Sequence, residues 1–211
     1  MGTLDQLTPV FVSLLVVIDP IGMAPIFLAL TRGGSAGYRR RMALKGVALA
    51  TAILLFFVFT GDTLLRFLGI SLPAFKITGG VLLFLLAIDM VFARQSGLRS
   101  TTVREQEEAQ YKDDISVFPL AFPLLAGPGA LTTILLTTGG ARHDPLLFAG
   151  ILAVLLGILL MTLLCLLLAP WLVKLLGETG TNVIDRLLGL ILAALAMQFM
   201  VEGIRSSFCA A

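Results

Sequence analysis

Two short motifs place proline and glycine inside apolar segments where an uninterrupted helix is otherwise expected. The first motif reads Asp19-Pro20-Ile21-Gly22 and continues Met23-Ala24-Pro25. Pro20 lacks an amide hydrogen and clashes with the carbonyl four residues earlier, whereas Gly22 lets the backbone leave helical geometry at low cost. Pro25 suits the first turn of a new helix. We therefore predict that a helix ends near Ile18 and restarts near Met23.

The chemistry of such an interruption follows from its backbone. A restarted helix presents N–H groups and the positive end of its dipole, which together can hold an anion. Asp19 is the ionisable group of the motif, and it could contact a substrate ammonium group or carry a coupling proton. It could equally cap the restarted helix, because Asp is a favoured N-cap residue. A simple proline kink is the structural alternative for the motif as a whole.

The second motif has the same character and lies in the other half of the chain. It reads Ala126-Gly127-Pro128-Gly129-Ala130, with Thr132 and Thr133 following. Glycine on both sides of Pro128 favours true unwinding over a smooth kink. The hydroxyl groups of Thr132 and Thr133 could donate into the interruption, or they could bond back to carbonyls of their own helix. Paired interruptions of this kind are a sequence pointer to a transport site at the middle of the membrane.

Two further polar residues lie at matching places in later apolar segments. Asp89 is near the end of the third segment, and Gln198 takes the corresponding position in the sixth. We expect both to support the interrupted helices from neighbouring helices. The alternatives are an interfacial position for Asp89 and an ordinary interhelical hydrogen bond for Gln198.

The elements that must position these residues are membrane helices. The chain is 58% hydrophobic and 13% charged, with a mean hydropathy of +1.01. Soluble domains are less apolar and carry about twice the share of charged residues. Helices are required, because a lipid-facing backbone must satisfy its own hydrogen bonds and the apolar segments do not alternate as barrel strands do. The six apolar segments are Leu7–Leu30, Gly46–Leu68, Ala74–Ala93, Ile115–Thr138, Leu146–Val173 and Leu187–Ser207.

The distribution of basic residues predicts the orientation of these helices. The first, third and fifth connections carry most of the lysines and arginines: Arg32, Arg39, Arg40, Arg41 and Lys45; Arg94, Arg99, Arg104 and Lys112; Lys174 and Arg186. Connections rich in Lys and Arg stay in the cytoplasm. We therefore expect loops one, three and five to be cytoplasmic and both termini to lie outside.

Spacing within the chain indicates an internal repeat. From Pro20 to Gly69 is 49 residues, and the same distance separates Pro128 from Gly177. Each repeat then contains three helices, and an odd number inverts the second repeat in the membrane. The predicted fold is all-α: six transmembrane helices in two inverted repeats, with helices one and four broken. Its parts are residues 1–93, a polar cytoplasmic connector at 94–114, and residues 115–211.

Signatures of other functions are missing from the sequence. His143 has no Cys, His or carboxylate neighbours at metal-ligand spacing, and Cys165 and Cys209 have no paired spacing. No nucleophile motif or phosphate-binding loop is present. The net charge of +2, with basic residues confined to loops, does not indicate nucleic-acid binding. We expect no enzymatic activity, no metal and no cofactor, and the lipid bilayer as the main surrounding partner.

The motifs together resemble the MarC family of bacterial and archaeal membrane proteins, over nearly the whole chain. The resemblance rests on these residues: Asp19-Pro-Ile-Gly22, Pro25-Ile-Phe27 and Thr31; Gly79-Gly80 leading to Ala87-Ile-Asp89; Ala126-Gly-Pro-Gly129; Gly189 leading to Ala196-Met-Gln198. It implies two inverted triplets of helices in an inner or plasma membrane. It also implies transport of small neutral amino acids such as glycine or alanine. The family usually has asparagine where this chain has Asp19.

The resulting hypothesis is a secondary transporter whose site lies between the broken helices one and four. A small zwitterion would place its carboxylate on backbone N–H groups, and Asp19 would take its ammonium group or a coupling proton; sodium is the other coupling ion considered. Two alternatives stay open, namely an exporter of amino acids or other small metabolites, and a membrane scaffold or regulatory protein that transports nothing. The sequence leaves the substrate, direction, coupling ion and oligomeric state undetermined.

Overall fold

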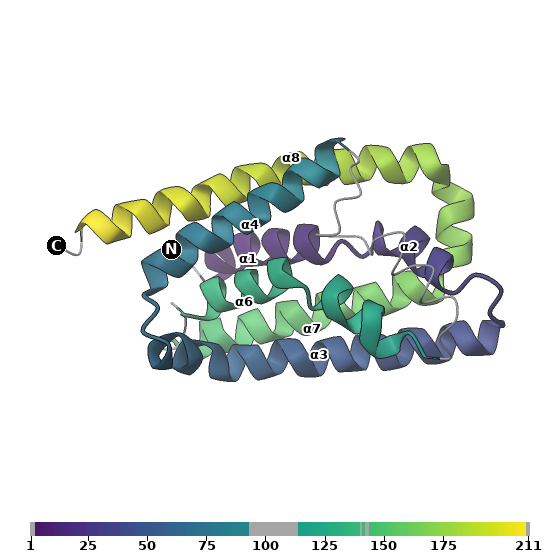
Figure 1. Cartoon of the computed structure of the whole chain (residues 1–211), viewed down its shortest axis with the longest axis horizontal. Helices are drawn as coiled ribbons and strands as arrows, with labels where there is room; N and C mark the ends of the chain where they lie inside the picture. Colours follow the sequence, from purple (N-terminus) through teal and green to yellow (C-terminus); the bar gives the residue numbers. More distant parts are fainter. Residues whose placement is uncertain (1–2, 93–113, 140, 142–143, 210–211) are drawn as a thin grey trace.

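The computed structural model describes residues 3–92, 114–139, 141 and 144–209. Within these ranges the chain is helical apart from short connections, and it contains no β-strand. The elements in chain order are α1 (Thr3–Ile18), α2 (Met23–Leu30), α3 (Ala36–Phe67), α4 (Leu72–Phe92), η1 (Ser116–Leu125), α6 (Pro128–Gly139), α7 (Pro145–Leu167) and α8 (Ala169–Cys209) (Figure 1). The expected all-α class is confirmed. Apart from Asp114, the expected connector at 94–114 lies outside the described residues.

The helices are long and apolar enough to cross a membrane five or six times. Five candidate spans are Asp5–Leu30, Ala36–Phe67, Leu72–Phe92, Pro145–Leu167 and Thr179–Phe208, the first of which contains both α1 and α2. The pair η1 and α6 is bent by 54° and makes a sixth span if it is counted as one. These spans fall on the six apolar segments of the sequence, so the chain is a multi-pass integral membrane protein.

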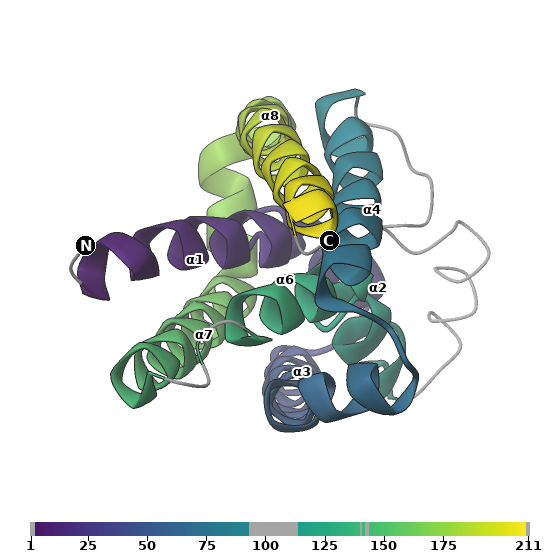
Figure 2. The ribbon, with the colours of Figure 1, turned by 90° about the vertical axis from the view of Figure 1, so that its left-hand side faces the viewer.

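The helices are stacked in three layers, which Figures 1 and 2 show from the side and along the bundle. Helices α4 and α8 form one outer layer, and α3 and α7 form the other. Helices α1 and α6 lie between them. The chain runs back and forth along the bundle, so that α1 begins and α8 ends at the same end (Figure 1).

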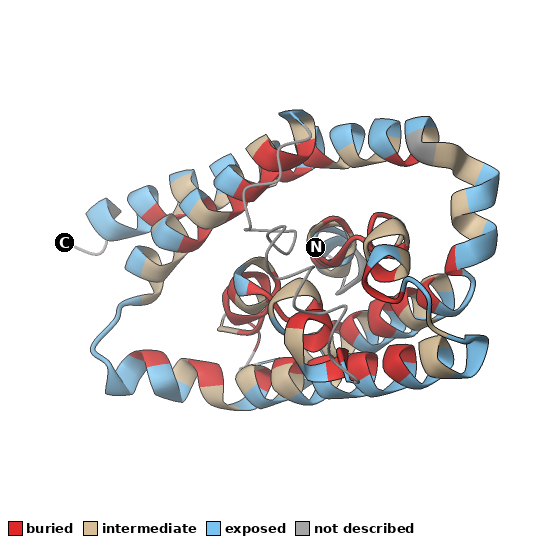
Figure 3. Cartoon of the chain, turned by 45° about the vertical axis from the view of Figure 1, so that its right-hand side comes forward, coloured by how far each residue is buried: buried red, intermediate tan, exposed pale blue. Residues whose placement is uncertain are grey.

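Burial follows this layering. In the span made by α1 and α2, 67% of the most apolar stretch is buried within the protein, whereas in the last span the share is 22%. Figure 3 shows the buried positions concentrated in the middle of the bundle and on the inner faces of the outer helices. A backbone that departs from helical geometry is tolerated at membrane depth only where protein or a wet cavity surrounds it. The central layer supplies that surrounding for Asp19 and Pro20, which are both buried.

The first half of the fourth apolar segment is less regular than expected. The prediction placed its interruption at 127–129, but Phe118 and Phe122 already have extended backbone, with φ, ψ of −129°, 126° and −132°, 130°. Each of these residues precedes a proline, Pro119 or Pro123. The proline ring disfavours helical geometry in the residue before it. The segment is therefore irregular over much of η1 and becomes a regular helix at Pro128.

The fifth and sixth helices also differ from their expected bounds. The helix expected over Leu146–Val173 ends at Leu167, because Pro170 cannot donate to the helical ladder. The chain then begins α8, which is bent at Gly177, where φ is +64°. Figure 1 shows the start of α8 crossing the end of the bundle before the rest of the helix turns back along it.

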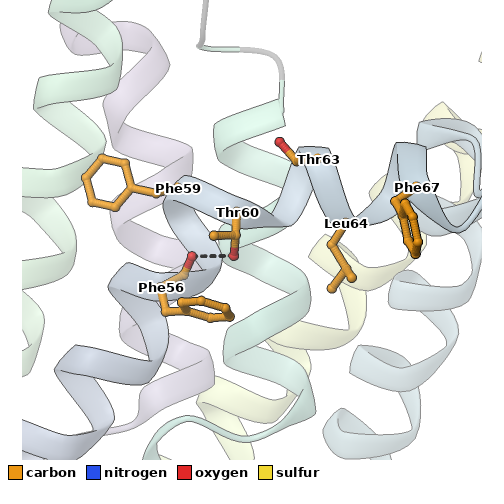
Figure 4. Close-up of a pocket in the computed structure, with 6 residues that line it drawn as sticks. All are labelled: Phe56, Phe59, Thr60, Thr63, Leu64 and Phe67. Atoms are coloured by element: carbon orange, nitrogen blue, oxygen red, sulfur yellow. Dashed lines mark hydrogen bonds between the residues drawn. The ribbon is translucent and has the colours of Figure 1, made fainter.

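The outer face of α3 presents apolar side chains away from the bundle. A shallow hollow on this face is lined by residues of α3 alone: Phe56, Phe59, Thr60, Thr63, Leu64 and Phe67 (Figure 4). The hydroxyl of Thr60 donates to the carbonyl oxygen of Phe56 at 2.6 Å, so its polar group is satisfied within the helix. Such a face suits contact with lipid acyl chains.

Candidate functional site

The first proline motif gives the backbone a local reversal at Asp19. Helix α1 ends at Ile18, and Asp19 has φ of +47° in the left-handed region. The preceding helix still reaches it, since the N–H of Asp19 donates to the carbonyl of Leu15 at 2.9 Å. Asp and Asn enter the left-handed region more readily than most residues. The sequence thus places a tolerant residue where Pro20 excludes regular helix.

The side chain of Asp19 serves the start of α2. It is fully buried, and its Oδ1 accepts a hydrogen bond from the N–H of Gly22 at 3.1 Å. The carbonyl of Asp19 also accepts from the N–H of Met23 at 3.0 Å. The N-cap residue of α2 is Gly22, and no side chain caps the helix there. Asp19 therefore does not take the N-cap position expected for it, and it holds the N–H of the residue that does. Of the other motif residues, Pro20 and Gly22 are buried, whereas Ile21 and Pro25 are half-buried.

The second proline motif ends η1 and begins α6. The N–H of Ala126 donates to the carbonyl of Ala121 at 2.8 Å, and that of Leu131 donates to the carbonyl of Gly127 at 3.0 Å. Pro128 therefore occupies the first turn of α6, where its missing N–H costs nothing. A Cβ atom on Gly127 would lie 2.2 Å from the carbonyl oxygen of Pro123, so the close backbone approach requires glycine.

Thr132 and Thr133 are both buried. The hydroxyl of Thr133 donates to the carbonyl of Gly129 at 2.9 Å, which is the bond within its own helix that the sequence left open. The methyl group of Thr132 packs on Gly79 of α4, where an added Cβ would lie 2.1 Å from it. Both residues therefore brace the start of α6.

The two interruptions lie next to each other in the central layer. A Cβ atom on Gly129 would come within 3.1 Å of the side chain of Val17, two residues before Asp19. It would also lie 3.2 Å from Leu86 and 3.3 Å from Leu83, both on α4. Sequence reasoning did not select these three apolar residues, because core residues give no chemical signal. Their contacts show that the end of α1 and the start of α6 meet against α4.

Asp89 and Gln198 are placed differently from each other. Asp89 is 8% exposed on α4, whereas Gln198 is exposed on α8 and donates to Glu202 at 2.9 Å. Glu202 in turn forms an ion pair of 3.3 Å with Lys76 on α4. Gln198 therefore belongs to a polar cluster that joins α4 to α8. The spacing of four residues between Gln198 and Glu202 could have indicated their contact, but only the fold brings Lys76 to them.

A second ion pair fastens the start of η1 to α3. The Nζ of Lys45 lies 2.8 Å from the Oδ2 of Asp114, and Asp114 also accepts from both the N–H and the hydroxyl of Ser116. The Lys45 ammonium group, followed by the Ser116 donors, holds the pKa of Asp114 well below its usual range. The sequence alone marks Lys45 only as one of the basic residues that indicate orientation.

The chemical groups of this arrangement are few. In the described part of the chain, no three His, Cys, Asp or Glu side chains gather in a way that could hold a metal ion. The interruptions instead bring together one buried carboxyl group, helix ends and small residues. Gly127 is buried, but Pro128 beside it is exposed, so the second interruption reaches the surface of the bundle.

Comparison with known proteins places the chain in a family. Residues 4–208 match the model of the MarC family of integral membrane proteins. The chain is 41% identical over 198 residues to the UPF0056 membrane protein MJ1677 of Methanocaldococcus jannaschii, covering 93% of this chain and 95% of that protein. It is 36% identical over 203 residues to the UPF0056 membrane protein YhcE of Escherichia coli, covering 94% and 91%. It is 37% identical over 202 residues to the UPF0056 membrane protein YvbG of Bacillus subtilis, covering 94% of each.

No solved structure matches the chain. The family match spans all the helices described above, and it includes both proline motifs. The full-length likeness to archaeal and bacterial membrane proteins agrees with the multi-pass helical fold. The chain therefore belongs to the MarC family of integral membrane proteins.

Proposed function

We propose that this protein is a secondary transporter of small neutral amino acids, with its substrate site between the broken helices one and four. One observation carries the proposal: the end of α1 and the start of α6 meet at the centre of the bundle, through Val17 and Gly129. Interrupted helices that meet near the middle of the membrane are the usual construction of such sites. Helices α3, α4, α7 and α8 cover this pair on both sides (Figure 2).

The arrangement of the helices supports an inverted repeat, which transporters of this kind use for alternating access. Each layer holds one helix from each half: α4 with α8, α1 with α6, and α3 with α7 (Figures 1 and 2). Within each pair the two helices run in opposite directions along the bundle (Figure 1). Packing between the pairs follows the same correspondence. Helix α1 of the first half contacts α7 of the second, and η1 of the second half contacts α3 of the first.

Residue contacts between α4 and α8 repeat the same relation. A Cβ atom on Gly80 would lie 2.5 Å from Met200, and one on Gly189 would lie 3.1 Å from Val91. Gly189 follows Gly80 by the same number of residues as Met200 follows Val91. If each half is replaced by its counterpart in the other half, the contact between Gly80 and Met200 becomes the contact between Gly189 and Val91. This supports the correspondence of helix three with helix six.

The backbone indicates how a zwitterion could be oriented. At the start of α2, the N–H groups of Gly22 and Met23 already donate to Asp19. At the start of α6, the first helical hydrogen bond is the one from the N–H of Leu131 to the carbonyl of Gly127. The N–H groups of Gly129 and Ala130 come before it in the chain, in the first turn, where a helix has no partners of its own for them. We therefore assign the substrate carboxylate to the start of α6 and the ammonium group, or a coupling proton, to Asp19. The close packing around Gly129 favours substrates with small side chains.

The proposed orientation places the basic end of the bundle in the cytoplasm. The connection between α2 and α3 and the start of α8 lie at one end, opposite the end where α1 begins and α8 finishes (Figure 1). The positive-inside rule then puts loops one, three and five in the cytoplasm and both termini outside. Cysteine accessibility at the connection after α3 would test this orientation.

The transport proposal is tested with the purified full-length protein in proteoliposomes. Uptake of radiolabelled glycine or alanine should be saturable, and it should respond to an imposed pH gradient or sodium gradient. Asp19→Asn keeps an oxygen for the Gly22 N–H and should fold, but it should remove any dependence on the pH gradient. The absence of saturable uptake or efflux of any small amino acid would rule out this substrate class.

A further inference from the structure

A hollow lined by both basic and apolar side chains lies at the end of the bundle, away from the proposed transport site. It is lined by the first turns of α3, the last turn of α7 and the start of α8: Ala36, Arg39, Arg40, Leu166, Leu167 and Pro170. Two arginines therefore share one hollow with three apolar residues from other helices. Neither the helix interruptions nor the α4–α8 contact contributes to it.

The arginines of this hollow are available to an anion. Arg40 is exposed and Arg39 is half-buried. Among the residues that the structure describes, the ion pairs involve Lys45, Arg66 and Lys76 and leave out both of these arginines. The planar guanidinium group matches a phosphate oxygen pair in a way that an ammonium group does not. Two such groups on adjacent residues favour a phosphate ligand.

The apolar part of the hollow places it at the membrane surface. Leu167 is 38% exposed, and the neighbouring Leu168 is 52% exposed. The start of α8 then crosses the end of the bundle before the bend at Gly177 (Figure 1). It exposes Trp171 and Leu175. Tryptophan prefers the headgroup region of a bilayer, where its ring is partly apolar and partly polar.

We propose that this hollow binds an anionic phospholipid, with the phosphate on Arg39 and Arg40 and the upper acyl chain along the exposed side chain of Leu167. The charge of the ligand is complementary to the two arginines, and its acyl chain is complementary to the exposed surface of Leu167. A free phosphate ion would satisfy only the basic side of the hollow. The proposal is independent of the transport function, because none of these residues lies in either helix interruption.

The protein contains a single tryptophan, Trp171, and it lies next to Pro170 of the hollow. Its fluorescence therefore reports lipid at this place. The full-length protein is reconstituted in phosphatidylcholine that contains increasing fractions of brominated phosphatidylglycerol, or of brominated phosphatidylcholine as reference. Brominated chains quench tryptophan only at contact. We expect the anionic lipid to quench Trp171 at a lower mole fraction than the neutral one.

Variants of the arginine run make the test specific. Arg39→Gln and Arg40→Gln should each lower the preference for phosphatidylglycerol by about fivefold, because each removes a guanidinium group that contacts the phosphate within the hollow. Arg41→Gln removes the same charge from the next residue, which is exposed but does not line the hollow, and it should change the preference by less than about twofold. Arg40→Lys should retain part of the preference, which separates loss of charge from loss of fold.

Two results would overturn the proposal. Equal quenching by the two brominated lipids, or equal effects of Arg39→Gln and Arg41→Gln, would show only general attraction between a basic surface and anionic lipid. Displacement of brominated phosphatidylglycerol by millimolar inorganic phosphate would show a site for the phosphate ion alone. Neither result bears on amino acid uptake, so this proposal and the transport proposal fail separately.

Discussion

At the scale of single residues, Asp19 has two properties that follow from its type and its position in the sequence. It precedes Pro20, so regular helix is disfavoured at that position, and its own side chain can hold the N–H groups of the restarted helix. The structure shows φ of +47° and the hydrogen bond to Gly22. A buried acid at this place costs free energy that an amide would not. That cost is the reason to expect a role in coupling or in binding an ammonium group.

A prediction at the same scale concerns the ion pair between Asp114 and Lys45. The lowered pKa of Asp114 means that its carboxylate stabilises the folded state above the ordinary value of 3.8 and stops doing so as pH falls toward the lower folded pKa. Asp114→Asn should therefore lower the thermal unfolding temperature at neutral pH. The difference from the original protein should shrink as the pH is taken from about 5 to about 2.

The measurement for Asp114 is thermal unfolding of the detergent-solubilised protein over this pH range. Asp62→Asn is the matched control, since Asp62 pairs with Arg66 at a distance of 3.0 Å on the same helix and does not join two elements. A pH-independent difference for Asp114→Asn would contradict the assigned cause.

At the scale of elements, the prolines decide where helices end and the glycines decide how closely they approach. Pro20, Pro128 and Pro170 each mark a boundary that local chemistry explains. The extended residues Phe118 and Phe122 follow the same rule, although the apolar pattern alone gave a continuous helix there. Hydropathy located the segment correctly. It does not distinguish a regular helix from an irregular backbone, because both can have the same apolar composition.

The prediction at this scale compares two glycines. Gly127→Ala should destabilise the protein by about 1–3 kcal/mol, because the new methyl group meets the Pro123 carbonyl and the backbone must shift. Gly157→Ala on α7 meets no atom within 4 Å and should be neutral or slightly stabilising. Equilibrium unfolding in mixed micelles measures both, and equal effects would refute the close approach at Gly127.

At the scale of the whole molecule, the two halves are interleaved rather than placed side by side. Every layer contains one helix from each half (Figure 2). Small residues allow the closest of these approaches, as is usual between membrane helices. The interleaving buries the irregular backbone at Asp19 and Pro20, and it brings Val17 of one half against Gly129 of the other.

The prediction for the whole molecule follows from this relation. Gly80→Ala and Gly189→Ala each insert a methyl group at the α4–α8 contact, where the new Cβ would lie 2.8 Å from the Ala196 carbonyl oxygen and 2.7 Å from the Cβ of Met90. Each should cost about 1–3 kcal/mol. If the halves are equivalent, the two losses should be similar. The same unfolding assay, with Gly157→Ala as reference, decides this, and a neutral result at either glycine would count against the equivalence.

The sequence by itself determined the helical class, the position of the membrane segments and the two proline motifs. These depend on local properties, namely the apolar content of a segment and the missing N–H of proline, which act over a few residues. The tertiary structure alone decided that the two motifs meet through Val17 and Gly129, and that Lys76 of α4 pairs with Glu202 of α8. Those outcomes depend on which helices become neighbours. The spacing of residues within one segment does not determine that packing, because the residues that meet are far apart in the sequence.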